Sequence, residues 1–271
     1  MLLPHSVLAG TRGRVLIEGS DSVSPRGDRI AVVASYGHGP SLSTSLETMV
    51  VRLEECGYSV IVSRASDDTR PLEWSDDYDG NAIVLRKPNV GYDFGSWAVA
   101  MDRFPDIRSA PYVLFVNDSL VGPFASLQPM IDNFEATNSD VWAATNTTQF
   151  FPHIQSFFMG FRNGCLDTRS LKGFWSGLRV ETDKQRIIHQ YELGFSRLLF
   201  GESFTATACY QSERVVEHGL NPSISGWRRL LDLGFPFIKR ELITNPSVVS
   251  DGHMVVPEVI TRFGVDPRSW L

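Results

Sequence analysis

The chain has 271 residues, of which 42% are hydrophobic and 21% charged, values that are ordinary for a globular protein with a full core. Its net charge of −6 argues against a nucleic-acid binder that works by neutralising phosphates. The sequence shows no run of about 18 apolar residues and no basic leader segment, so we expect neither a membrane span nor secretion.

The cysteines and the even composition indicate one intracellular domain. Cys56, Cys165 and Cys209 are odd in number and far apart, and they lack the spacing of a zinc site. We expect buried, reduced thiols in a cytosolic protein. Residues 1–28 are rich in Gly, Ser and Arg and predict a loose N-terminal arm, which leaves 29–271 as a single domain.

The first 120 residues alternate between predicted strands and helices. Continuous apolar runs predict strands at 30–35, 58–63, 82–86 and 112–117. Apolar residues at helical spacing predict helices over 42–56 and 93–104. This order predicts right-handed parallel units in a doubly wound α/β sheet that binds its ligand at the carboxyl ends of the strands. The glycines after the first strand do not form a Gly-x-Gly-x-x-Gly fingerprint, so an ordinary nicotinamide or flavin fold is not expected.

The second half is less regular. Strands are predicted at 140–144, 155–162 and 203–209, and a long helix at 183–200. The sheet is therefore expected to be mixed in this half. In such an architecture the second half often supplies the acceptor side of a site.

A polar cluster follows the apolar strand 112–117 and precedes a Gly-Pro turn. It contains Asn117, Asp118 and Ser119. A carboxylate flanked by an amide and a hydroxyl at this edge is placed to meet a substrate or a metal. The same residues also form Asx turns very often, and this segment alone favours the turn.

Segment 86–97 joins the third predicted strand to a helix. Asp93 is placed to be the N-cap of that helix, which would explain its residue type. The segment also offers the cation Arg86, the amide Asn89 and glycines such as Gly91, which let a ligand approach the backbone. These parts suit a nucleoside diphosphate, and a purely structural turn is equally consistent with them.

Two later segments carry further polar groups. His153 begins a predicted strand together with Gln155 and Ser156, and a lone histidine is usually structural. Glu192 follows Tyr191 at the start of an apolar helical stretch. A half-buried carboxylate there could act as a general base, whereas a surface neighbour of an arginine is the plainer interpretation.

These clusters occur together and in order along the chain. They are Arg-x-x-Asn-x-Gly-x-Asp-Phe-Gly-x-Trp at 86–97, Asn-Asp-Ser-x-x-Gly-Pro at 117–123, Asp-x-Trp at 140–142, His-x-Gln-Ser-x-Phe at 153–158 and Tyr-Glu-x-Gly at 191–194. The series resembles the rhamnan synthesis F family of bacterial polysaccharide glycosyltransferases over residues 30–250. A later Asn-Pro at 221–222 and the segment 234–239 fit the resemblance too.

The resemblance implies a GT-A-like single domain: a Rossmann-like, mainly parallel sheet with helices on both faces and a mixed C-terminal half. It implies a dTDP-β-L-rhamnose donor, inversion at the anomeric carbon, and a glycan or lipid-linked glycan acceptor. The segment 117–119 falls where such enzymes carry an Asp-x-Asp metal motif, but only its middle residue, Asp118, is a carboxylate. A divalent cation, Mg²⁺ or Mn²⁺, is therefore an open expectation with Asp118 as its ligand.

The resemblance also assigns roles to the candidate residues. Catalysis is expected from Glu192 and His153, with Glu192 as the base. Gln155, Ser156 and Tyr191 are expected to contact or support the acceptor. Donor binding is expected from a larger set at the strand ends: Ser35, Arg64, Arg86, Asn89, Gly91, Asp93, Asn117, Asp118 and Ser119.

Two functions remain open at this point. The first is a cytoplasmic glycosyltransferase that adds a deoxyhexose to a cell-surface polysaccharide. A lipid-linked acceptor would bring it to the inner face of the membrane, although no basic amphipathic helix stands out. The second is a catalytically silent nucleotide-sugar or glycan-binding module, which the missing outer carboxylates motivate. A hydrolase would need a Gly-x-Ser-x-Gly elbow, which the sequence lacks.

Overall fold

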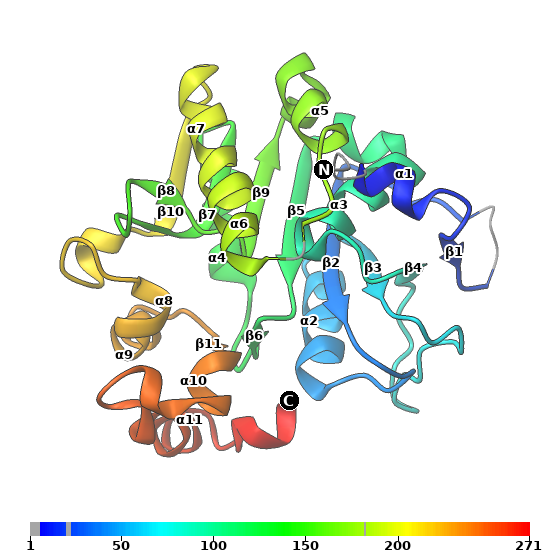
Figure 1. The fold of residues 1–271 in the computed structure, drawn as a ribbon. Helices are drawn as coiled ribbons and strands as arrows, with labels where there is room; N and C mark the ends of the chain where they lie inside the picture. Colours follow the sequence, from blue (N-terminus) through cyan, green and yellow to red (C-terminus); the bar gives the residue numbers. More distant parts are fainter. Residues whose placement is uncertain (1–5, 20–22, 182) are drawn as a thin grey trace.

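The computed structural model describes residues 6–19, 23–181 and 183–271 and is built on a central nine-stranded sheet (Figure 1). Eight strands follow the order β1-β4-β3-β2-β5-β9-β7-β10, and β8 adds to β7. Their bounds are Leu16–Ile17 (β1), Arg29–Tyr36 (β2), Ser59–Ala65 (β3), Ile83–Lys87 (β4), Tyr112–Asn117 (β5), Val141–Thr147 (β7), His153–Ile154 (β8), Phe158–Arg162 (β9) and Ala206–Tyr210 (β10). A separate pair joins β6, Leu120–Val121, to β11, Ile238–Lys239.

The helices surround this sheet. Their bounds are Val7–Thr11 (α1), Thr44–Glu55 (α2), Tyr92–Arg103 (α3), Gln128–Ala136 (α4), Arg169–Ser176 (α5), Lys184–Ile187 (α6), Leu193–Gly201 (α7), Pro222–Ser225 (α8), Trp227–Asp232 (α9), Arg240–Thr244 (α10) and Val255–Phe263 (α11). A π-helical turn, Ile188–Glu192, connects α6 to α7 without a break, as the predicted long helix requires. No helix within the described residues is both long and apolar enough to cross a lipid bilayer.

The first half is parallel, as predicted. Strands β4, β3, β2 and β5 run parallel to one another, and the chain order reverses between β2 and β5. The helix after β2 packs on one face and the helix after β4 on the other. A crevice at the carboxyl ends of β2 and β5 is the expected ligand position for this topology.

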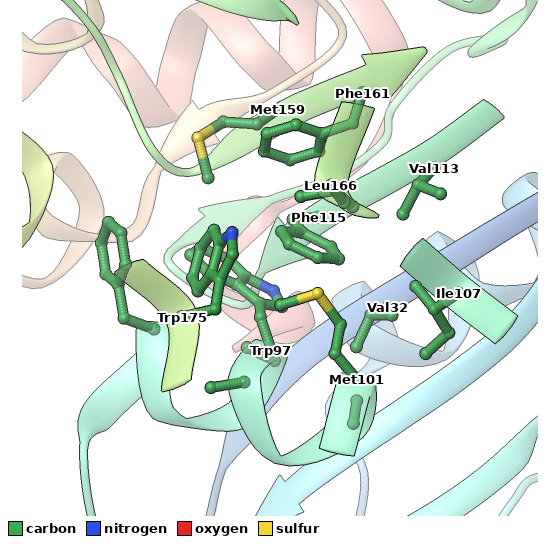
Figure 2. Packing of buried hydrophobic residues seen from close by; sticks show 14 of the residues in the cluster. Val32, Trp97, Met101, Ile107, Val113, Phe115, Met159, Phe161, Leu166 and Trp175 are labelled. Atoms are coloured by element: carbon green, nitrogen blue, oxygen red, sulfur yellow. The ribbon is translucent and has the colours of Figure 1, made fainter. Parts of the chain in front are cut away.

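The two faces of the sheet carry separate apolar cores. One core packs α3, α5 and α7 against the sheet, and the other packs α2 and α4. In the first, the rings of Trp97 and Phe115 stack with centroids 5.5 Å apart, and Trp175 meets Phe115 edge-on at 5.4 Å (Figure 2). Burying three large aromatic rings at one point stabilises the contact between α3 and β5, the two elements that carry Asp93 and Asn117.

The mixed second half is confirmed, with several strand boundaries shifted. Strand β9 is antiparallel to both β5 and β7, and β10 is parallel to β7. The strand predicted at 155–162 begins only at Phe158, because residues 156–157 form a turn after β8. The three cysteines are unpaired, with Cys165 buried and the other two half-buried.

The expectation of a loose arm over 1–28 is wrong for much of its described part. The α1 residue Val7 is 1% exposed and belongs to the core beside α3. Strand β1 pairs antiparallel with β4 through Leu16 and Ile17. The few apolar residues of this Gly- and Arg-rich segment are enough to cover the edge of the sheet.

The C-terminal segment forms a third, smaller core. Helices α9 to α11 gather beside β6 and β11, seen in orange and red in Figure 1. Ile238 pairs with Val121 and Lys239 with Leu120 in the β6–β11 ladder. This ladder brings the segment around residue 239 to the carboxyl end of β5.

Candidate functional site

A cleft of about 630 Å³ opens beside the carboxyl end of β5. Its walls come from the start of α3, the segment after β5, the turn at 155–157, the π-turn, α8 and the start of α10. The cleft brings together six residues that the sequence predicted for the site: Asp93, Asn117, Ser119, Gln155, Ser156 and Glu192.

At the switch point between β2 and β5, two hydrogen bonds join the end of β2 to Asp118, the residue after β5. The Tyr36 N–H at the end of β2 donates to Asp118 Oδ2 over 2.9 Å, and the Asp118 N–H donates to Ala34 O over 3.1 Å. Asp118 therefore ties β2 to β5. It does not itself line the 630 Å³ cleft.

A continuous chain of hydrogen bonds runs along the cleft wall. Lys239 Nζ donates to Ser119 Oγ over 2.8 Å, and the Ser119 hydroxyl and N–H both donate to Asn117 Oδ1. The Asn117 amide donates in turn to Asp93 Oδ2 over 2.7 Å. The Asx turn predicted for 117–119 is thus present, and the same side chains face the cleft.

Asp93 sits in the first turn of α3 but is not its N-cap. Gly91 takes the N-cap position with φ +83°, a left-handed conformation that strains any residue with a side chain. A Cβ there would also lie 2.8 Å from Val7 Cγ2. Burial and the nearby Asp118 charge raise the pKa of Asp93 to about 7, while Lys239, Asn117 and Lys87 act in the opposite direction. Asp93 can therefore exchange a proton near neutral pH.

Lys87 lies under this site at the end of β4. It is 1% exposed, and its ammonium has no hydrogen-bond partner among the described residues. Burial lowers the pKa of Lys87 to about 8, partly offset by the Asp93 charge. Lys87 belongs to the segment 86–97, but from the sequence we chose its neighbour Arg86 and assigned no role to Lys87.

Glu192 also lines the cleft. It ends the π-turn and accepts the Ser156 N–H at Oε1 over 3.1 Å. Single π-turns within helices are rare and often occur at functional sites. In the plainer interpretation Glu192 was a surface neighbour of Arg197; the structure places the Arg197 guanidinium over Phe151, 4.7 Å from the ring centroid.

The floor of the cleft is held by Gln155. Gln155 Oε1 accepts from Thr145 Oγ1 over 2.6 Å, and Gln155 Nε2 donates to Asn221 Oδ1 over 3.1 Å. Asn221 also caps α8 through the Ser223 N–H. The Asn-Pro at 221–222 noted in the sequence thus serves to fix Gln155.

Two predicted residues point away from the cleft. His153 is 6% exposed, and its Nδ1 contacts the Phe151 carbonyl over 2.8 Å. The Tyr191 hydroxyl both accepts from the N–H and donates to the carbonyl of Arg179, at 2.8 Å each. Neither residue lines the cleft. Their contacts position the turn before β8 and the π-turn.

Arg64 and Ser35 form a separate arrangement at the ends of β3 and β2. Arg64 Nη1 donates to Ser35 Oγ over 2.7 Å, and Nη2 donates to the carbonyls of Gly39 and Ser41. A Cβ at Gly37 would lie 1.8 Å from Arg64 Nη2, so only glycine fits over this guanidinium. The loop after β2 is folded around Arg64.

Arg86 is engaged by the N-terminal segment. Its Nη1 pairs with Glu18 Oε1 at 3.0 Å, and its Nη2 donates to the Asp68 carbonyl. Asn89 is exposed in the loop before α3. Of the nine predicted donor-binding residues, the cleft brings together Asp93, Asn117 and Ser119.

The residues at the strand end do not fit a divalent cation. Within the described parts of the chain, no group of three or more His, Cys, Asp or Glu side chains lies close enough to hold a metal ion. One carboxylate oxygen of Asp118 already accepts the Tyr36 N–H, and the Ser119 hydroxyl already accepts from an ammonium. Hard divalent cations need several oxygen ligands, which this arrangement does not offer.

Two cationic residues of the cleft were not predicted. Lys239 and Arg240 both line it. They contact residues 117–119, which we call the strand-end cluster. Lys239 ends the segment 234–239 that fits the family resemblance, but no role was assigned to it there, and both residues lie about 120 positions after Ser119.

Comparisons with known proteins give one matching family and several distant relatives. The model of the family "Rhamnan synthesis protein F" matches residues 75–262, which include the whole cleft. The virulence protein VirA of Vibrio anguillarum is 26% identical over 211 residues, covering 66% of this chain and 68% of VirA. The uncharacterized protein y4gN of Sinorhizobium fredii is 23% identical over 231 residues, covering 82% of this chain and 58% of that protein. The chain belongs to the rhamnan synthesis protein F family.

Proposed function

We propose that this chain is a GT-A-type glycosyltransferase that transfers a sugar from a nucleoside diphosphate sugar to a hydroxyl of a growing cell-surface polysaccharide. The family's link to rhamnan synthesis supports this assignment. The observation that carries it is the cleft at the carboxyl end of β5, where Glu192 lies on one wall and Lys239 on another. A base and a cation facing one cavity are the groups that sugar transfer from a diphosphate requires.

The donor we propose is dTDP-β-L-rhamnose, because the family is named for a rhamnose polymer. Transfer with inversion would then give an α-linked product. The acceptor hydroxyl attacks the anomeric carbon and its proton passes to Glu192. The bond from that carbon to the diphosphate oxygen breaks, and the diphosphate leaves with the electron pair.

The geometry of Glu192 supports its role as the base. Its Oε1 is fixed by the Ser156 N–H, so the carboxylate is oriented before substrate arrives. The Gln155 network holds the neighbouring backbone at the cleft floor. We place Ser156 and Gln155 on the acceptor side, and Asp93, Asn117 and Ser119 on the donor side.

The acceptor would be a glycan, including one linked to a membrane lipid. We therefore place the protein in the cytoplasm, with peripheral contact at the inner face of the membrane. The relative VirA carries the name of a virulence protein, which is consistent with a role in building a surface glycan.

The first test of the proposed function is a screen of nucleotide sugars. Purified protein is incubated with dTDP-rhamnose, UDP-glucose and GDP-mannose, and thermal unfolding is followed. A ligand present at about 100 times its dissociation constant adds roughly 2.7 kcal/mol to stability. We expect dTDP-rhamnose to give the largest shift.

The second test is Glu192→Gln. Loss of the general base should lower the rate of rhamnose transfer by about 10²–10⁴-fold, while donor binding is kept. Glu202→Gln is the matched control, because Glu202 is exposed just after α7 and does not line the cleft. Full turnover in Glu192→Gln would exclude Glu192 as the base.

Donor binding without transfer to any glycan acceptor, in the unaltered protein, would support the silent binding module, which the single carboxylate at 117–119 favours.

A further inference from the structure

The β6–β11 ladder positions Lys239 beside the strand-end cluster. The β6–β11 ladder places Lys239 opposite Leu120, directly after Ser119. The next residue adds three hydrogen bonds: the Arg240 N–H donates to Ser119 O over 2.8 Å, and its guanidinium donates twice to Asp118 O at 3.1 and 3.0 Å. The lysine is therefore fixed relative to residues 117–119 by backbone contacts on both sides.

The ammonium of Lys239 is also fixed. It lies 2.8 Å from Ser119 Oγ and 4.1 Å from the centroid of the Phe157 ring, a cation–π contact. Lys239 is half-buried and lines the cleft. The Lys239 ammonium thus lies beside Ser119, the third residue of the segment 117–119.

This position matters because of what a divalent cation would need there. An ion bound at Asp118 would take its next protein ligand from Asn117 or Ser119. The Asn117 carbonyl oxygen accepts twice from Ser119, and the Ser119 hydroxyl accepts from Lys239. An ion at Ser119 would meet the lysine charge at short range and be repelled by it.

We propose that Lys239 is a built-in cation that binds the donor diphosphate in place of a divalent metal, while Arg240 holds this segment against residues 117–119 through its bonds to Asp118 O. This inference rests on the proposed function. When the bond from the anomeric carbon to the diphosphate oxygen breaks, the oxygen keeps the electron pair, and its added negative charge faces Lys239. Because Ser119 and Phe157 hold the ammonium in place beforehand, little reorganisation accompanies this step.

The test measures binding of dTDP, UDP and GDP by calorimetry in 1 mM EDTA and in 5 mM MgCl₂ or MnCl₂, concentrations chosen as about those that strip or saturate a protein-held ion. We expect the dissociation constant of the best-bound diphosphate to differ by less than about twofold between the two conditions. Lys239→Gln should weaken it by about tenfold or more, which corresponds to roughly 1.4 kcal/mol.

Two further variants keep the test sharp if Lys239→Gln folds poorly. Lys239→Arg retains the charge and should keep binding within about threefold, still without metal. Lys172→Gln is the matched control, because Lys172 lies on α5, pairs with Asp167 at the surface and does not line the cleft. Circular dichroism and thermal unfolding show which variants are folded.

The outcomes separate this inference from the proposed function. If diphosphate binding is tenfold weaker in EDTA than in MgCl₂ or MnCl₂, or if folded Lys239→Gln binds as well as the unaltered protein, the built-in cation is wrong and the glycosyltransferase proposal stands. If none of the three diphosphates binds under any condition, both proposals fail.

Discussion

Two sets of cations lie at the same edge of the sheet, and they differ in what they contact. Arg64 and Arg86, which we call the locked arginines, are 5% and 4% exposed, and their guanidinium groups donate to protein carbonyls, a hydroxyl and Glu18. Lys239 is half-buried and lines an open cleft. Each of the three is one of the last two residues of its strand, yet only the two arginines were chosen from the sequence as candidates for a diphosphate.

A cation at a strand end becomes part of the scaffold when neighbouring loops accept the hydrogen bonds that its side chain donates. A guanidinium has five donors in a rigid fork, which suits it to organise carbonyls from several turns. The loop after β2 folds over Arg64, and the N-terminal segment folds over Arg86. Lys239, in contrast, contacts the Ser119 hydroxyl and the Phe157 ring and lines the cleft.

The largest effect is expected from breaking a locked arginine. Arg64→Met leaves Ser35 and the carbonyls of Gly39 and Ser41 without their donor in a buried position, and should lower the free energy of unfolding by about 2–4 kcal/mol. Urea unfolding measures this. Arg52→Met is the control, because Arg52 pairs with Glu55 at the surface, and should cost no more than about 1 kcal/mol. If Arg64→Met is fully stable but binds dTDP poorly, Arg64 belongs with Lys239 and the comparison fails.

A smaller change in the free energy of unfolding, of opposite sign, is expected from replacing Lys87, the buried lysine under the site. Lys87→Met should raise the free energy of unfolding at pH 7 by about 1–3 kcal/mol, because it removes a buried ammonium without a hydrogen-bond partner among the described residues. The folded protein releases this proton near pH 8, whereas the unfolded chain holds it until about pH 10.5. The unaltered protein should therefore gain stability as pH rises from 8 to 10.5, and the variant should lose that gain.

If stability depends on pH in the same way in Lys87→Met and in the unaltered protein, the pKa of Lys87 is not lowered and this prediction is wrong. Lys172→Met is the control, since Lys172 is an exposed lysine with a surface ion pair. A large loss of diphosphate binding in Lys87→Met would instead place Lys87 among the ligand-binding cations.

The smallest effect concerns Asp93, the carboxylate between the cations. Burial raises its pKa to about 7 in the folded protein, whereas an unfolded aspartate titrates near 4. Between these values the folded state holds a proton that the unfolded state has lost, so stability falls as pH rises from about 4 to 7. Asp93→Asn should remove that decline, which we put at about 1–2 kcal/mol because the cleft side of Asp93 still meets solvent.

Unfolding by urea at pH 4.5, 6 and 7.5 measures the Asp93 effect. Asp102→Asn is the matched control, because Asp102 is exposed near the other end of α3. Parallel pH profiles for Asp93→Asn and the unaltered protein would contradict a raised pKa at Asp93.

The parallel half of the fold was predictable because its signals are local. Each strand from 30–35 to 112–117 is a buried apolar run, and a strand buried on both faces needs nothing else to be recognised. The turn at residues 155–157 and the packed N-terminal segment were not predictable in the same way. Their conformations depend on partners such as Thr145, Asn221 and β4, which lie far away in sequence.

The site was predictable in part for the same reason. Asp93, Asn117, Ser119 and Glu192 could be chosen because polar residues at the end of an apolar strand or within an apolar helix stand out locally. His153 and Tyr191 stand out equally well, yet their side chains bind nearby backbone groups. Residue type and position along the chain do not determine which way such a side chain faces.

The sequence alone predicted the alternating α/β architecture and the polar strand ends at the carboxyl edge of the sheet, because apolar runs and the polar residues that end them are recognised from neighbouring residues. Only the tertiary structure decided which charges reach that place. The β6–β11 ladder brings Lys239 to Ser119, and the loops after β2 and β1 turn Arg64 and Arg86 into scaffold. The physical reason is that a charge acts on whatever lies within a few ångströms, and contacts between residues 120 positions apart exist only once the chain has folded.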